Sequence, residues 1–283
     1  PESGSYDDAY AYICAGINIP AVEDRGKLIL IVDNTISASL DKELTRLELD
    51  YVGDGWTIIR YDYDRSGTGD PSALRTLIKA EYDSDPDNVK AVCLFGRLPI
   101  VKSGYSNPDG HGSAPRVTDL FYSDVDGTWT DSTYDIEDKN IPGDGIYDQN
   151  AVPGNVELQI GRVDFANMSA WSQSETELLK NYLRKNHVYR NALLVPPLRA
   201  IDSKSGYLYD DRAGLAPTVG LGNSINSKFV DTQKTPAIWG IDFSDWNRNN
   251  YPGYDFRMVF CINFGSYKLN WDQSNNHMRS ILA

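Results

Sequence analysis

Three short apolar runs separated by helical spacers constrain the fold of this chain more than any other feature. The runs cover residues 27–33, 56–61 and 89–95. In the first and third, apolar residues follow one another without alternation, which is typical of strands buried on both faces. Asp70 followed by Pro71 is typical of the start of a helix in the second spacer. The order strand, helix, strand, helix, strand predicts a parallel, doubly wound α/β sheet. Asp33 lies at the C-terminal end of the first strand, where such sheets usually bind ligands.

The second half of the chain predicts another α/β unit. A short strand is expected at residues 157–162, and Ser174 with Glu177 forms a capping box that indicates the start of a helix. Residues 257–263 form a further apolar run, which we expect to be a central strand, as we expect for residues 89–95.

These patterns predict a division of the chain into three parts. They are a lead-in segment at 1–26, a first α/β subdomain at 27–163 and a second α/β subdomain at 164–283 that is incomplete at its C-terminus. Because the chain starts at Pro1, without an initiator methionine, we expect a processed or excised piece of a longer precursor.

Composition excludes several classes of function. The net charge of −13 argues against binding to nucleic acid, because phosphate contacts need clustered lysine and arginine. The sequence contains no run of 18 apolar residues, so we expect no membrane span. The odd number of cysteines, three, argues against a fully paired disulfide framework, and buried thiols are expected instead.

An acidic stretch at residues 119–148 predicts a metal site. Between Asp124 and Asp148 it carries eight carboxylates against one base, Lys139, and no nearby cation in the sequence offsets them. Alternating hard oxygen ligands followed by glycine suit Ca²⁺, although the spacing does not fit an EF-hand. The candidate Ca²⁺ ligands are Asp124, Asp126, Asp131, Asp135, Asp144 and Asp148. The alternative is a solvated acidic linker, but interleaved aromatic residues such as Trp129 are uncommon in disordered acidic tracts.

The centre of the chain resembles a known family. Residues 118–129 read Thr-Asp-Leu-Phe-Tyr-Ser-Asp-Val-Asp-Gly-Thr-Trp and precede the acidic loop, and residues 160–163 read Ile-Gly-Arg-Val. This order is similar to that of the gingipain family of cysteine peptidases. Residues 96–100 and 108–111 resemble its large environmental branch. The resemblance implies a caspase-like fold of two adjoining, mainly parallel α/β subdomains, export from a bacterial cell and bound calcium.

The resemblance also implies a place for the catalytic residues. In the family, histidine in a Gly-His-Gly-Ser turn follows a buried strand, and cysteine ends the next strand. The matching turn here carries Phe264 at the histidine position, and the strand for the cysteine is expected beyond Ala283. His111 lies in a Gly-His-Gly-Ser match that comes too early in the chain, so we interpret it as a surface-loop residue. Cys261 lies inside an apolar run and is expected to be an inert core thiol.

The sequence leaves three hypotheses for function. The first is a gingipain-like domain of a secreted bacterial protein that has lost catalysis and acts as a calcium-stabilised extracellular scaffold, adhesion or assembly module with protein or self-assembly partners. The second is an active, calcium-dependent cysteine endopeptidase, completed by residues outside this chain or by a dyad with His111. The third, prompted by Trp239, Trp246 and Tyr251, is an α/β domain that binds a small molecule or carbohydrate. Two other histidines, His187 and His277, are expected on exposed helix surfaces.

Overall fold

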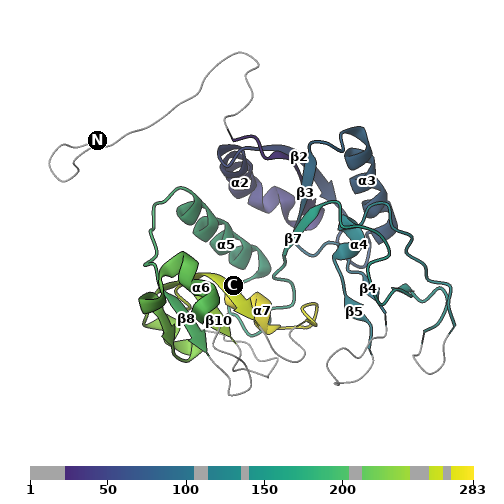
Figure 1. Ribbon diagram of the computed structural model, residues 1–283. Helices are drawn as coiled ribbons and strands as arrows, with labels where there is room; N and C mark the ends of the chain where they lie inside the picture. The colour runs from purple at the N-terminus through teal and green to yellow at the C-terminus, as the bar shows by residue number, and fades with distance from the viewer. Residues whose placement is uncertain (1–22, 105–113, 135–139, 204–211, 243–254, 264–268) are drawn as a thin grey trace, which may run out of the picture.

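The computed structural model describes residues 23–104, 114–134, 140–203, 212–242, 255–263 and 269–283, and Figure 1 shows their arrangement. Two parallel sheets, each with helices beside it, make up a mixed α/β fold. This architecture confirms the fold class that the sequence predicts. No helix in the described part of the chain is both long and apolar enough to cross a membrane.

The first sheet contains the three apolar runs as neighbouring strands. Its order is β2-β1-β3-β7, and all of its pairings are parallel. The strands are β1 (Gly26–Asp33), β2 (Trp56–Tyr63), β3 (Val89–Phe95) and β7 (Gln159–Val163). The helices that belong to this half are α1 (Asn34–Ser37), α2 (Asp41–Gly53), α3 (Pro71–Ser84) and α5 (Glu175–Arg190), and a 3₁₀ turn at Ala38–Leu40 joins α1 to α2.

The burial of β1 explains why its sequence does not alternate. Leu28, Leu30 and Val32 face a core formed with α2 and α5. Ile29 and Ile31 face a second core, formed with α3 and the region around Phe121. Because both faces of the strand are covered, successive residues must all be apolar. The first core takes in Leu178, Leu179 and Leu183 of α5, so it extends beyond Val163.

The second sheet has the order β11-β10-β8-β9 and is also parallel. Its strands are β8 (Ala200–Ser203), β9 (Ser224–Asn226), β10 (Ala237–Asp242) and β11 (Met258–Asn263). Its helices and 3₁₀ turns are α6 (Arg212–Val219), Leu221–Asn223 and Phe229–Gln233. The buried cluster here is smaller than those of the first sheet and centres on Ala200, Leu215, Val219 and Ile241.

The position of β11 differs from the sequence prediction. Val89–Phe95 is an interior strand as predicted, but the prediction of a central strand at residues 257–263 is wrong, because β11 pairs with β10 alone among the described strands. Phe260 and Ile262 remain 39% and 46% exposed on it. Strand β10, which the sequence patterns did not reveal, occupies the interior place, and its Trp239 is half-buried against Phe260 at 4.8 Å between ring centroids. Trp246 and Tyr251 lie outside the described residues.

A small third sheet and a short helix support the acidic loop. The sheet consists of β4 (Lys102–Ser103), β5 (Arg116–Val117) and β6 (Ile146–Tyr147), and the helix is α4 (Leu120–Ser123). The last element is α7 (His277–Leu282), which follows β11.

The segment 269–283 joins the two sheets. The guanidinium of Arg162 in β7 lies over the ring of Trp271, 4.9 Å from its centroid. Lys102 pairs with Asp272, and Arg279 donates to Asp164 just after β7. Through these contacts the end of the described chain packs on the first sheet, although it follows the last strand of the second.

Candidate functional site

The carboxyl edge of the first sheet is closed by ion pairs. Asp33, at the end of β1, is fully buried and accepts hydrogen bonds from the backbone N–H groups of Thr35 and Arg97. Its second oxygen pairs with Arg65 at 2.5 Å, and Arg65 also binds Glu175 at 2.7 Å. A ligand at this edge would have to displace these contacts, so we assign Asp33 a structural role.

The acidic loop brings together three carboxylates. Oxygen atoms of Asp124, Asp126 and Glu157 all lie within 4.8 Å of one another, the one such group that the described residues form. Asp124 is buried, Asp126 is exposed and Glu157 is half-buried. Glu157 was not among the sequence candidates, because it follows the loop at the start of the next apolar run. Its Oε2 accepts the backbone N–H of Val125 at 2.9 Å, which fixes it beside the first two carboxylates.

Glycines shape the loop around Asp124. The N–H of Gly127 donates to Oδ1 at 2.8 Å and that of Gly154 to Oδ2 at 3.2 Å, and the indole Nε1 of Trp129 donates to Oδ2 at 3.1 Å. A Cβ atom on Gly127 would lie 2.2 Å from Oδ2, and one on Gly154 would lie 2.5 Å from Oδ1. The backbone can therefore approach the carboxylate only because both positions lack side chains.

Arg75 of α3 supplies a cation to this loop. Its Nη2 donates to the backbone oxygens of Asp124 at 2.5 Å and Gly127 at 2.7 Å, and its Nε donates to Asp124 O at 3.2 Å. Burial lowers the pKa of Arg75, while the charges of Asp124, Asp126 and Glu157 act in the opposite direction. The cation that the neighbouring sequence lacks is therefore supplied by α3, which carries Arg75 into contact with the loop from 49 residues away in sequence.

The other sequence candidates lie elsewhere in the loop. Asp131 accepts the N–H groups of Gly143 and Gly145, each at 2.8 Å, and Asp144 accepts that of Ile146 at 2.8 Å. Neither belongs to the three-carboxylate cluster. Asp135 lies outside the described residues.

Asp148 ties the two sides of the loop together. It accepts hydrogen bonds from Thr130 Oγ1 at 2.7 Å, from Asn140 Nδ2 at 2.9 Å and from the N–H of Ser132 at 3.1 Å. Burial acts to raise its pKa, but the hydrogen bonds outweigh burial and lower the pKa of Asp148 to about 2. The carboxylate is thus used in closing the loop, and it too lies outside the cluster.

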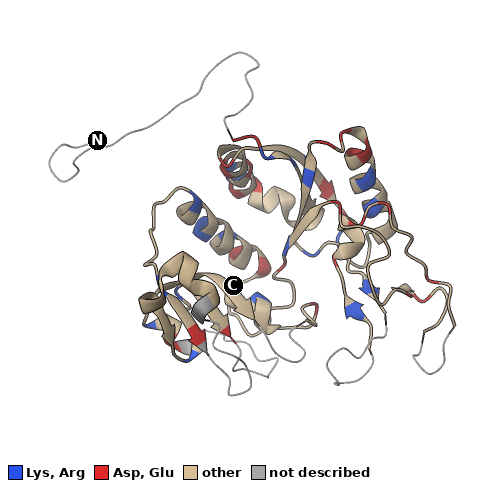
Figure 2. Cartoon of the chain, viewed as in Figure 1, with Lys and Arg blue, Asp and Glu red and all other residues tan. Residues whose placement is uncertain are grey.

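The cluster fits a divalent cation in the chemistry of its donors. Carboxylate oxygens are the ligands that Ca²⁺ prefers. Three carboxylates and the Arg75 guanidinium leave two uncompensated negative charges, which one divalent ion would neutralise. Figure 2 shows the acidic residues of this loop beside α3 and its basic residues.

The spacing at Gly127 gives a direct test of this loop. Gly127→Ala should displace the Asp124 carboxylate, because the added methyl would lie within 2.3 Å of both of its oxygens. We expect a loss of about 1–3 kcal/mol in the free energy of unfolding, the cost of overpacking a close contact. Gly53→Ala is the matched control, since a Cβ there meets no atom within 4 Å. Urea denaturation of the two variants measures the difference, and equal stability would contradict the close approach.

The carboxyl edge of the second sheet holds a buried polar cluster. Asp242 ends β10 and Asn263 ends β11, and the two residues are opposite each other in the parallel register. His277 of α7 is 0% exposed. Its Nε2 lies 2.7 Å from Asp242 Oδ2 and 3.0 Å from Asn263 Oδ1. The expectation of an exposed His277 is therefore wrong, because α7 turns this side chain onto the strand ends.

The other thiols and imidazole of the described residues have hydrogen-bond partners of their own. His187 Nδ1 lies 2.9 Å from both oxygens of Asp50, at the contact between α5 and α2. Cys93 of β3 lies near the Tyr51 hydroxyl, and burial raises the pKa of its thiol. Cys261 accepts a hydrogen bond from Asn263 Nδ2 at 3.2 Å, so the asparagine lies between this thiol and His277. His111, Cys14 and Phe264 lie outside the described residues.

Comparison with known proteins supports the resemblance found in the sequence. The model of peptidase family C25 matches residues 57–194, a range that contains β2, α3, the acidic loop, β7 and α5. A comparison with curated proteins gave no match.

Two solved structures resemble the fold. The complex of the pro- and mature domains of RgpB from Porphyromonas gingivalis matches with a TM-score of 0.55 and 12% sequence identity, over 91% of this chain and 60% of that one. The Arg-specific cysteine proteinase gingipain R has a TM-score of 0.48 and 13% identity, over 85% of this chain and 51% of that one. The chain thus spans less than two thirds of either structure. The family match over residues 57–194, the loop motif and the shared fold together support a gingipain-family peptidase domain, that is, one of peptidase family C25.

Proposed function

We propose that this domain is catalytically inactive and serves, outside a bacterial cell, as a calcium-stabilised scaffold, adhesion or assembly module. The observation that carries the proposal is the chemistry at the ends of β10 and β11. The family resemblance requires a histidine after one buried strand and a cysteine at the end of the next. Here two successive, adjacent parallel strands end in Asp242 and Asn263.

The presence of β10 allows a second alignment of the family's histidine and cysteine strands with the strands of this chain. The sequence interpretation set residues 257–263 as the histidine strand, which gives Phe264 the place of the histidine. With β10 as the earlier strand, β11 corresponds to the cysteine strand, and Asn263 stands at its end. Neither alignment supplies a complete Cys–His pair. A carboxamide is not a nucleophile of the kind that forms an acyl-enzyme, and phenylalanine transfers no proton.

The contacts of Asn263 and His277 also support inactivity. A general base needs its ring nitrogen within hydrogen-bond reach of the nucleophile. The Nε2 atom of His277 faces Asp242 and the Asn263 oxygen, whereas the Cys261 thiol is met by the Asn263 amide. The buried cluster therefore has the character of a structural hydrogen-bond network.

Calcium supports the scaffold role through the cluster of Asp124, Asp126 and Glu157. Bound there, the ion would supply positive charge and hold the loop against α3 beside Arg75. The extracellular location and the bacterial origin are proposed from the family resemblance. The partners are protein surfaces or further copies of the same chain.

Peptide hydrolysis is the direct test of inactivity. We expect no cleavage of unfolded casein or of Arg- and Lys-containing fluorogenic peptides, with Ca²⁺ and a reducing agent present. A working general base contributes about 10²–10⁴ in rate, so an active enzyme would be easily distinguished. Iodoacetamide should likewise label Cys261 no faster than an ordinary thiol.

Three variants identify the source of any activity that is found. Hydrolysis that is lost in both Cys261→Ala and His277→Ala would overturn the proposal and establish a dyad of these two residues. Loss in Cys261→Ala and His111→Ala would instead establish the peptidase that uses the loop histidine. Hydrolysis that survives all three substitutions comes from a contaminant and leaves the expected inactivity of this chain in place.

A further inference from the structure

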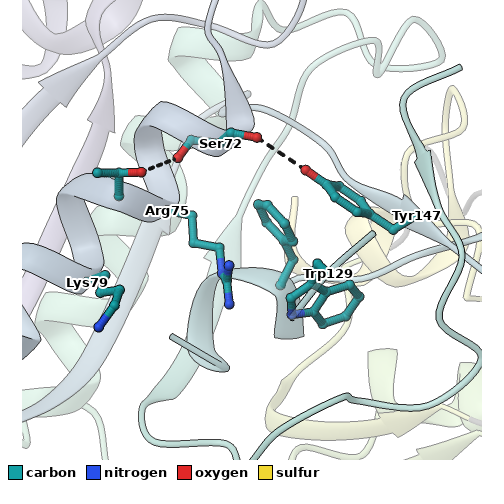
Figure 3. A pocket seen from close by; sticks show the side chains of 7 residues that line it. Ser72, Arg75, Lys79, Trp129 and Tyr147 are labelled. Carbon is teal, nitrogen blue, oxygen red and sulfur yellow. Dashed lines mark hydrogen bonds between the residues drawn. The ribbon is translucent and has the colours of Figure 1, made fainter. Parts of the chain in front are cut away.

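A pocket of about 170 Å³ lies where α3 meets the acidic loop (Figure 3). It is distinct from the three-carboxylate cluster and from the ends of β10 and β11. Three kinds of side chain line it: hydroxyls, cations and aromatic rings. The residues that carry the inference are Ser72, Thr76, Arg75, Lys79, Trp129 and Tyr147.

The aromatic side of the pocket is held rigidly. The rings of Trp129 and Tyr147 both pack on the buried Phe121, at 5.5 Å and 4.7 Å between centroids. Trp129 is anchored by the hydrogen bond from its indole to Asp124, and the Tyr147 hydroxyl lies 3.2 Å from Ser72 Oγ. Because these contacts already hold both half-buried rings in place, a flat ligand could stack on them without ordering further side chains.

The cationic side of the pocket has capacity left for an anion. The hydrogen bonds of Arg75 to the loop use Nε and Nη2, and its Nη1 makes no hydrogen bond to the described residues. Lys79 pairs with Asp83 at 2.8 Å, with the two side chains 43% and 55% exposed. Exposed pairs one helical turn apart are weak, so a ligand carboxylate can replace Asp83 as the partner of Lys79.

The size of the pocket limits what can enter. Sites for drug-sized ligands measure about 300–1,000 Å³, so a volume of about 170 Å³ admits a single ring or one side chain. We propose that this pocket binds one six-membered ring that bears a carboxylate, with the ring on Trp129 or Tyr147 and the carboxylate between Arg75 and Lys79. The hydroxyl oxygens of Ser72 and Thr76 can accept hydrogen bonds from the polar edge of the ring, since the Thr76 hydroxyl itself donates to the Ser72 backbone oxygen. This site goes beyond the proposed scaffold function, but it shares Arg75 with the proposed calcium cluster, so the titrations below are made with Ca²⁺ present.

Two ligand sources share this chemistry, an aromatic acid and an acidic sugar. We would titrate the protein at low salt with benzoate and with glucuronate, and follow the indole N–H resonance of Trp129, assigned with Trp129→Phe. Saturable binding in the millimolar range is expected for a ligand this small. The neutral analogues, benzamide and methyl glucoside, should bind at least about 10-fold more weakly, because hydrogen bonds to a charged carboxylate are the stronger kind.

Substitutions on α3 localise the binding. Thr76→Trp should fill the pocket and abolish binding, and because Thr76 is exposed the helix should tolerate it. Lys79→Gln should weaken binding about 3- to 10-fold, whereas Lys42→Gln, an equal change of charge at an exposed position of α2, should have no effect.

Each possible result of these experiments either supports or overturns the proposed binding site. Binding of benzoate alone, of glucuronate alone or of both supports the site and identifies its source. Saturation by neither acid, equal affinity for the neutral analogues, or full binding by Thr76→Trp would overturn the proposal. Peptide hydrolysis would contradict only the proposed scaffold function.

Discussion

Replacing Arg162 with alanine is expected to lower the free energy of unfolding by about 3–5 kcal/mol, the cost of removing one partner from a buried ion pair. Its guanidinium, 6% exposed, donates to both oxygens of Asp119, at 2.8 and 3.0 Å. It also donates to the backbone oxygens of Leu98 and Pro99 and lies over the Trp271 ring. The substitution leaves the Asp119 carboxylate and the Leu98 carbonyl without this donor, whereas the Pro99 oxygen keeps the hydrogen bond from the Tyr122 hydroxyl. Because domains are stable by about 5–15 kcal/mol in total, this is a large share.

Two further variants make the expectation for Arg162 specific. Lys79→Ala breaks an exposed pair within one helix, and should cost only about 0.3–0.5 kcal/mol. Arg162→Lys keeps the charge but loses the planar fork, so it should fall between the two. Urea denaturation provides the free energies. A loss below about 1 kcal/mol for Arg162→Ala would contradict the buried bridge between β7, α4 and the segment 269–283.

Removal of Ca²⁺ is expected to lower the melting temperature by roughly 5–10 °C. An ion at 100 times its dissociation constant stabilises the folded state by about 2.7 kcal/mol, and each kcal/mol corresponds to about 2–4 °C in a protein somewhat smaller than this one. Asp124→Asn should remove most of this response, because Asp124 is the buried member of the cluster. Melting curves with excess Ca²⁺ and with chelator measure the shift, and limited proteolysis should increase between residues 124 and 157 when the ion is removed.

The control for the calcium experiment is Asp87→Asn, which removes one exposed carboxylate from the turn before β3. It should keep the full response to chelator. Identical melting curves for the wild-type protein with and without Ca²⁺ would contradict a metal at the cluster. The loop would then be held by Arg75 and by the hydrogen bonds of its own carboxylates, such as those of Asp124 and Asp148.

The fold could be predicted from sequence where the signal was local or periodic. The runs that became β1 and β3 are apolar without alternation because both faces of each are covered. The cap of α3 at Asp70 and the capping box at Ser174 were also predicted, since both depend on residues two or three positions apart. Strand β10 could not be found in this way, because Trp239 and Gly240 gave no clear strand pattern and its place is set by pairing with β8 and β11.

The candidate site could be predicted only in part for the same reason. Asp124 and Asp126 are neighbours in sequence, and the structure brings them together. Glu157 lies just before β7 and Arg75 lies on α3, and both reach the same place. No local sequence pattern marks either residue as part of the site. Conversely, Asp131, Asp144 and Asp148 looked equivalent to the first two, but the structure places them elsewhere in the loop, outside the three-carboxylate cluster. The chemistry of a carboxylate is visible in a sequence, whereas its partner is not.

The bridge made by the segment 269–283 has a consequence for the order of folding. The Arg97 guanidinium donates to the backbone oxygen of Asp272, a closure of 175 residues, and that of Arg279 donates to Asp164 across 115. The entropy lost on closing a loop rises only with the logarithm of its length, so such contacts can be stable at equilibrium. They form late in folding, because the loop must close before they can be made. During synthesis the buried charges of Arg97 and Asp164 lack part of their native surroundings until residues 272–279 have left the ribosome. The first sheet is therefore first in sequence and among the last parts of the molecule to be completed.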